Sequence, residues 1–128
     1  MTMQMTTALW CVLAAGILPY VATSVAKAGG TGYDNRDPRQ WLGRQEGFRR
    51  RADSAQRNGF EAFPFFAAAV IVAQSIGASQ ERVDALAVIF IVARVVYTVC
   101  YVADWHGARS IAWLIGWVAT VAIFVTGV

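Results

Sequence analysis

Several ionisable and hydrogen-bonding side chains fall within or beside apolar stretches of the chain, where charge is costly. On a helix with a step of about 100° per residue, Asn58 and Glu61 share a face with Arg57, and Ser54 lies on the same face. Pro64 lies close to this face and removes one helical hydrogen bond, which predicts a kink beside the polar residues. A guanidinium, an amide and a carboxylate on one face could bind a charged small molecule.

A second polar face lies further along the chain. Tyr97, Tyr101 and Asp104 fall within about 80° of Arg94 on a helix. Arg94 stands near the middle of an apolar stretch, where inserting an arginine costs about 2.5–3.5 kcal/mol. It therefore needs a partner, and we predict Glu61.

These residues, together with Arg109, suit a small zwitterionic ligand that carries a surplus of negative charge. The predicted set is Arg57, Asn58, Glu61, Arg94, Tyr97, Tyr101 and Arg109. The alternative is structural: Arg94 and Glu61 would form an ion pair, and the tyrosines would anchor the helices at the membrane surface. His106 lacks the neighbouring ligands that a metal site needs, so no metal site is predicted.

The elements that carry these residues follow from the scarcity of charge. Only 15% of the 128 residues are charged, against about 25% in soluble domains, and 57% are hydrophobic. This composition excludes a free-standing soluble domain, a disordered chain and a disulfide scaffold. Long stretches with at most one charge can each cross a bilayer as a helix. We predict an all-α, integral membrane four-helix bundle in one domain, 1–128, with spans at about 6–26, 58–80, 84–103 and 109–128.

Basic residues indicate the orientation. Eight of the 11 lie between the first two predicted spans and Arg109 lies between the last two, whereas only Arg82 lies in the second loop. The positive-inside rule then places the first and third loops in the cytoplasm and both termini outside, in a cell inner (plasma) membrane. No binding motif accompanies the arginines, so we predict no nucleic-acid partner. The start of the chain lacks the basic residues of a signal peptide, and we expect the first span to be retained.

The first loop contains clear turn and helix signals. Gly29, Gly30 and Gly32 predict the end of the first helix, and Asp37 followed by Pro38 predicts the start of another, with a break at Gly43 or Gly47. The two cysteines, Cys11 and Cys100, fall at different depths of the predicted bilayer. No disulfide between them is expected.

Three segments together resemble a known family. Residues 51–64 contain an Asn, a Glu three residues later and a Pro three further, and are similar to the second helix of membrane-associated proteins in eicosanoid and glutathione metabolism (MAPEG). Residues 94–101 resemble the third helix of its prostaglandin E synthase and microsomal glutathione transferase members. Residues 34–39 are similar to the first loop of its bacterial branch.

The resemblance implies a homotrimer that binds glutathione between subunits on the cytoplasmic side. Asn58 and Glu61 would hold the γ-glutamyl end, and the tripeptide would lie along the residues Arg57, Arg94, Tyr97 and Tyr101. Arg109 would lie near the sulfur, as the catalytic residue, where an arginine favours the thiolate nucleophile. The expected activity is a glutathione transferase or glutathione-dependent peroxidase that acts on hydrophobic electrophiles taken from the membrane lipid.

The sequence departs from the family pattern at two places. Catalytic relatives carry an arginine four residues before the Asn, where this chain has Ser54, and Arg51 is one turn earlier. The third loop is about one residue shorter than in the prostaglandin-type relatives, which affects the match of Arg109. The residues therefore leave open a second reading, a non-catalytic lipid-binding or scaffold protein with the same bundle. A small channel is disfavoured because no pair of discontinuous helices is present.

Overall fold

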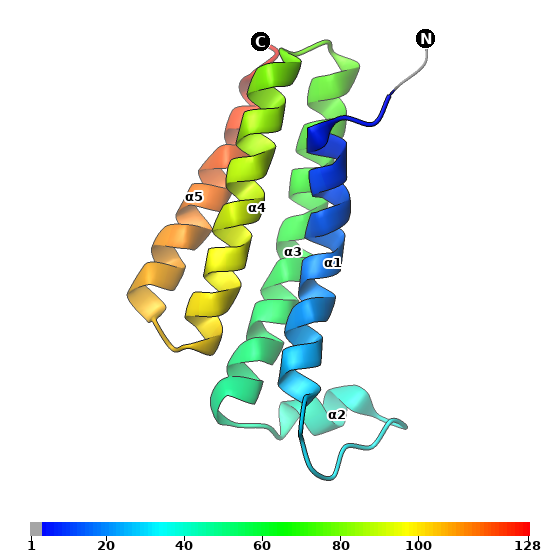
Figure 1. Ribbon diagram of the computed structural model, residues 1–128, viewed down its shortest axis with the longest axis vertical. Coiled ribbons are helices and arrows are strands. Elements are labelled where there is room, and N and C mark those ends of the chain that lie inside the picture. The colour runs from blue at the N-terminus through cyan, green and yellow to red at the C-terminus, as the bar shows by residue number, and fades with distance from the viewer. Residues whose placement is uncertain (1–3) are drawn as a thin grey trace.

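The computed structural model describes residues 4–128, so the first three residues of the predicted domain lie outside it. This part of the chain is all-helical, as predicted, and contains no strand. Its five helices are α1 (Thr7–Lys27), α2 (Pro38–Gly43), α3 (Gly47–Ser75), α4 (Gln80–Val102) and α5 (His106–Val125). The four long helices run side by side, and α2 lies across one end of them (Figure 1).

Three of the long helices, α1, α4 and α5, are long and apolar enough to cross a membrane. They correspond to the first, third and fourth predicted spans. Helix α3 differs because its first half carries a run of charged residues, although none occurs from Ala62 to its end at Ser75. Its passage through the membrane stays a prediction.

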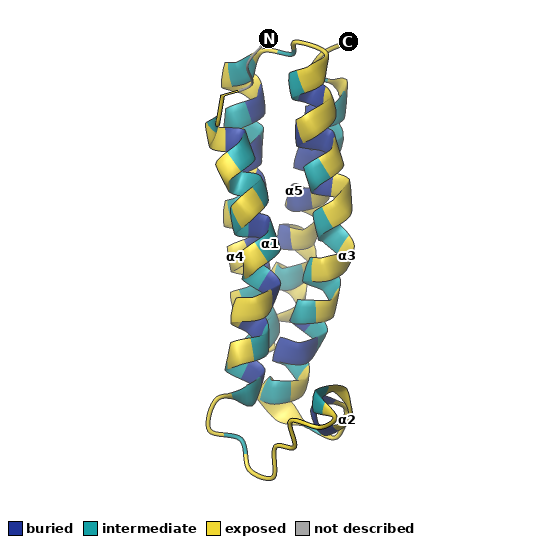
Figure 2. Cartoon of the chain, turned by 90° about the vertical axis from the view of Figure 1, so that its right-hand side faces the viewer, coloured by how far each residue is buried: buried dark blue, intermediate teal, exposed yellow. Residues whose placement is uncertain are grey.

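The core consists of alanine, aliphatic and aromatic residues between the long helices. Helix α1 packs along α3, and α4 packs along α5. Phe66 of α3 stacks on Phe90 of α4, with ring centroids 3.9 Å apart. Figure 2 shows that the buried residues form narrow stripes, while much of each helix surface is exposed. The exposed surface of α1 is apolar, including Trp10 and Leu13, which suits contact with lipid.

The first loop matches its sequence signals. Asp37 caps α2, since its carboxylate accepts a hydrogen bond from the backbone N–H of Gln40 at 3.2 Å. The predicted break is confirmed, because residues 44–46 separate Gly43 from Gly47. Trp41 is buried against Gly30, where an added Cβ would lie 2.5 Å from the indole ring. These contacts hold α2 against the end of α1.

The opposite end of the molecule contains a cap made between helices. The carboxylate of Asp84 on α4 accepts the backbone N–H of Ala8, in the first turn of α1, at 2.9 Å. It also accepts the side-chain amide of Gln80 at 2.7 Å. Orphan N–H groups at a helix start need such acceptors, so Asp84 links α4 to the start of α1.

The cysteines behave as expected. Cys11 and Cys100 are both free thiols, and Cys100 is buried.

Candidate functional site

Arg94 lies near the middle of α4 and is only 6% exposed. Its Nη1 donates a hydrogen bond to Oδ1 of Asn58 on α3 at 2.9 Å. Its guanidinium also lies 4.1 Å from the ring centre of Tyr97, a favourable cation–π distance. The buried cation is therefore held by a neutral amide and an aromatic face.

The predicted ion pair between Arg94 and Glu61 is wrong. No such pair occurs within residues 4–128. The physical reason is that Asn58 precedes Glu61 by one turn on the same face and offers an acceptor without burying a carboxylate. Glu61 stays exposed, with its charge unneutralised by any other residue in this part of the chain.

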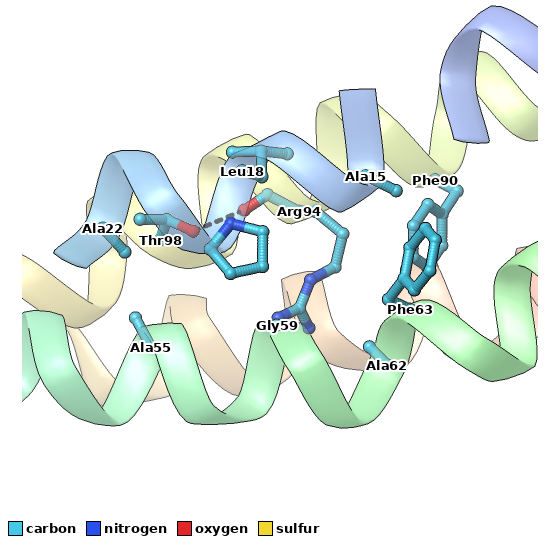
Figure 3. A pocket seen from close by; sticks show the side chains of 11 residues that line it. Ala15, Leu18, Ala22, Ala55, Gly59, Ala62, Phe63, Phe90, Arg94 and Thr98 are labelled. Carbon is cyan, nitrogen blue, oxygen red and sulfur yellow. Dashed lines mark hydrogen bonds between the residues drawn. The ribbon is translucent and has the colours of Figure 1, made fainter. Parts of the chain in front are cut away.

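A glycine lets the helices approach closely at this point. Figure 3 shows the guanidinium of Arg94 reaching from α4 to Gly59 of α3. A Cβ added to Gly59 would lie 2.8 Å from Cγ of Pro19 on α1. Close packing of α1 on α3 therefore depends on the absence of a side chain next to Asn58.

A cavity of about 250 Å³ opens beside Arg94, between α3, α4 and α5. Asn58, Glu61 and Arg94 all line it, so three of the predicted site residues meet here. The rest of its wall is mainly aromatic and includes Phe65, Phe90, Trp113 and Trp117. The cavity thus combines one cation, one carboxylate and one amide with an apolar surface.

A second cavity, of about 260 Å³, lies between α4 and α5 towards their connecting loop. Tyr97, Tyr101 and Arg109 line it, so three further predicted residues meet here. The guanidinium of Arg109 lies 4.2 Å from the ring centre of Tyr101. The two tyrosine rings meet edge to face at 5.6 Å, so a continuous row of contacts joins Arg94 to Arg109.

The two cavities share Trp113 as a common wall. Their combined volume falls within the range of about 300–1,000 Å³ that is usual for small-molecule sites. Together the two cavities contain two arginines and one carboxylate. These groups are spaced along the row of contacts between Arg94 and Arg109, which suits an elongated ligand. This arrangement favours a zwitterion with excess negative charge, as the residue types had indicated.

Arg57 is placed apart from the other predicted residues. Its guanidinium pairs with the carboxylate of Asp53 at 3.2 Å and points to a third cavity, near α2. Asp53 is buried and also accepts the side-chain amide of Gln56 at 2.8 Å. Glu61 lines both this cavity and the one beside Arg94. A role of Arg57 in binding the same ligand stays a prediction.

Two wall residues were missed from the sequence. Trp113 and Trp117 lie four and eight residues after Arg109, which places them within about 80° of it on α5. The same helical-wheel argument that grouped the residues of α3 and α4 would have found them. Their rings stack with centroids 6.4 Å apart.

The structure also shows whether Arg51 takes the place of the arginine that the family pattern predicts at position 54. Arg51, the nearest alternative, donates from Nε to the backbone carbonyl of Val102 at 3.1 Å. It therefore caps the carbonyl end of α4, a favourable place for a cation. In this conformation the guanidinium of Arg51 is directed to a helix end and does not replace the arginine expected at Ser54.

Comparison with known proteins decides the family. The sequence pattern of the MAPEG family matches residues 7–128, which is nearly the whole chain. The chain belongs to the MAPEG family. MAPEG members are membrane proteins of glutathione and eicosanoid metabolism. No curated protein and no solved structure matches the chain. The predicted family is therefore confirmed, and the three helices that are long and apolar enough to cross a membrane agree with MAPEG membership.

Proposed function

We propose that this MAPEG chain binds glutathione in the two cavities that share Trp113, and uses it to attack a hydrophobic electrophile from the bilayer. The observation that carries this proposal is the division of charge in the cavities. Arg94 is already held by Asn58, so the carboxylate of Glu61 is left to receive a cationic group. Glutathione offers one ammonium, two carboxylates and a thiol, which complements this set.

In the proposed pose, Glu61 and Asn58 receive the γ-glutamyl ammonium, while Arg94, Tyr97 and Tyr101 lie along the peptide. Arg109 lies at the far end of the row, near the thiol, where a guanidinium favours the thiolate form. In conjugation, the thiolate attacks a carbon of the electrophile, forms a C–S bond and displaces the leaving group with its electron pair. With a hydroperoxide, it attacks the outer oxygen and breaks the O–O bond, which gives an alcohol and glutathione sulfenic acid. A second glutathione then converts the sulfenic acid to glutathione disulfide and water. Arg57 also contributes to glutathione binding, from the adjoining cavity that it lines together with Glu61.

The electrophile would enter from the lipid. The aromatic wall of Phe65, Trp113 and Trp117 suits an apolar substrate, and Trp113 and Trp117 are both more than two-fifths exposed. We propose that the second predicted span, 58–80, crosses the membrane and includes the uncharged second half of α3, and that three copies assemble. In this topology the first and third loops lie in the cytoplasm and both termini lie outside.

Calorimetric titration of the detergent-purified protein with glutathione tests the binding step. Saturable binding at millimolar ligand is expected, and no heat of binding would refute the proposal. Glu61→Gln should weaken binding by about tenfold or more, because it removes one charge-assisted contact. Glu81→Gln is the matched control, since Glu81 is exposed at the opposite end of the molecule, in the first turn of α4.

A second candidate function is non-catalytic lipid binding or scaffolding. It is favoured by Ser54 at the position of the family arginine and by the engagement of Arg51 with Val102. Under this function, glutathione would bind normally, but no electrophile or hydroperoxide of a broad panel would be turned over. Turnover of any of them that is lost in Arg109→Ala would exclude it.

A further inference from the structure

The third cavity, of about 800 Å³, adjoins the pair assigned above to glutathione and shares Glu61 with the cavity beside Arg94. Its walls come from the end of α1, the first loop, α2 and the first half of α3. Four basic residues line it: Lys27, Arg36, Arg39 and Arg57. Only Arg57 has a carboxylate partner, Asp53, within residues 4–128.

The acidic residues of this cavity are largely committed to other contacts. Asp53 is buried and binds both Arg57 and Gln56. Asp37 caps the first turn of α2. Glu61 lies at the edge that adjoins the neighbouring cavity. The wall formed by the first loop and α2 therefore presents two guanidinium groups, Arg36 and Arg39, that form no ion pair within residues 4–128, while the carboxylate of Asp37 between them is engaged by α2.

The opposite wall is aromatic and belongs to the long helices. Tyr20 of α1 and Phe60 of α3 line the cavity and meet edge to face, with ring centroids 5.3 Å apart. Both rings are exposed, by 62% and 42%. They lie near the end of the membrane-crossing α1, which finishes at Lys27. Aromatic rings at this height are typical of the boundary between lipid and water.

We propose that this cavity binds the phosphate headgroup of an anionic membrane phospholipid. Arg36 and Arg39 would contact the phosphate, and the acyl chains would leave the cavity past Tyr20 and Phe60. Guanidinium groups match the planar, two-point geometry of phosphate contacts, and basic pockets near the cytoplasmic surface attract anionic lipids. A choline headgroup would bring its own cation towards these arginines and would bind less well. The site does not depend on glutathione.

Native mass spectrometry of the whole, delipidated protein in neutral detergent tests the proposal by counting bound lipids. Phosphatidylglycerol is titrated against phosphatidylcholine of the same chain length. The first phosphatidylglycerol should bind at least about tenfold more tightly than phosphatidylcholine. Arg36→Gln with Arg39→Gln should remove most of this preference, and Arg39→Gln alone should remove part of it.

The matched control is Arg44→Gln with Arg50→Gln. These arginines lie in the same region and carry the same charge, but neither lines the cavity. The control should keep the preference to within about twofold, since only contacts in the cavity are proposed to matter. Helical circular dichroism and monodisperse elution confirm that each variant folds.

Three results would overturn the proposal. Equal binding of the two lipids to the unaltered protein would exclude a headgroup site. Equal loss in both double variants would show diffuse attraction to the basic loop. Displacement of the lipid by millimolar inorganic phosphate would show a site for soluble anions.

Glutathione titration of the same variants keeps the two proposals separate, because loss of glutathione binding on changing Arg36 and Arg39 would assign this cavity to glutathione instead.

Discussion

Replacing Asn58 with alanine should destabilise the protein, because it leaves the buried guanidinium of Arg94 without its hydrogen-bond acceptor. Neutral side-chain hydrogen bonds between membrane helices contribute only about 0.6 kcal/mol on average. This bond involves a charged donor that is 6% exposed, and hydrogen bonds to charged groups contribute about 1.5–3 kcal/mol. The contact of Arg94 with Tyr97 remains and offsets part of the cost. We therefore expect a loss of about 2 kcal/mol.

The free energy of unfolding is measured by titrating the protein with dodecyl sulfate in mixed micelles and following helical circular dichroism. Asn58→Asp is the control, since it keeps an acceptor at the same place and should remain within about 1 kcal/mol of the unaltered protein. Combining Asn58→Ala with Arg94→Met removes both partners and should recover at least half of the loss.

The reasoning would be refuted if Asn58→Ala cost less than about 0.5 kcal/mol, which would mean that Arg94 finds another partner at little cost. Glu61, one turn further along α3, is the obvious substitute. The double variant Asn58→Ala with Glu61→Gln tests this explanation. A large further loss of stability in the double variant would show that Arg94 had moved to Glu61.

Three further predictions concern single positions. Gly59→Ala should lower the free energy of unfolding by about 1–3 kcal/mol, because the added Cβ meets Pro19. Gly107→Ala should not lower it, because a Cβ there meets nothing within 4 Å. Equal unfolding midpoints of the two variants in detergent would contradict this. Asp84→Ala should cost about 0.5–2 kcal/mol and expose the first-turn amides of α1 to hydrogen exchange, and unchanged exchange at Ala8 would rule out the cap. Arg109→Ala should reduce the ultraviolet thiolate absorbance of bound glutathione with assembly intact, while Arg82→Ala, at the other end of the molecule, should not.

Much of the local architecture was predictable from the sequence. The all-helical fold, the start of α2 at Pro38 and the break between Gly43 and Gly47 all follow from short-range signals. The first, third and fourth spans follow from apolar length, which the bilayer imposes on any single helix. The family could also be recognised, because residues 51–64 and 94–101 carry its pattern locally.

The partners of the polar residues could not be predicted in the same way. Helical periodicity places Asn58 and Glu61 on one face, but it does not decide which of them Arg94 reaches from another helix. That choice depends on the rotation and depth of α3 against α4, which are determined by packing between helices. Close approaches such as Gly59 on Pro19 help to determine that packing.

The sequence grouped Arg57 with the ligand-binding residues, whereas the tertiary structure turns its guanidinium towards Asp53 and a different cavity. The grouping was sound for a single helix, since Arg57, Asn58 and Glu61 do share one face of α3. A helix face is wide enough to border two cavities, and the neighbouring helices divide it between them. Residue types and their spacing thus determine which chemistry is present, and contacts between helices decide which groups act together.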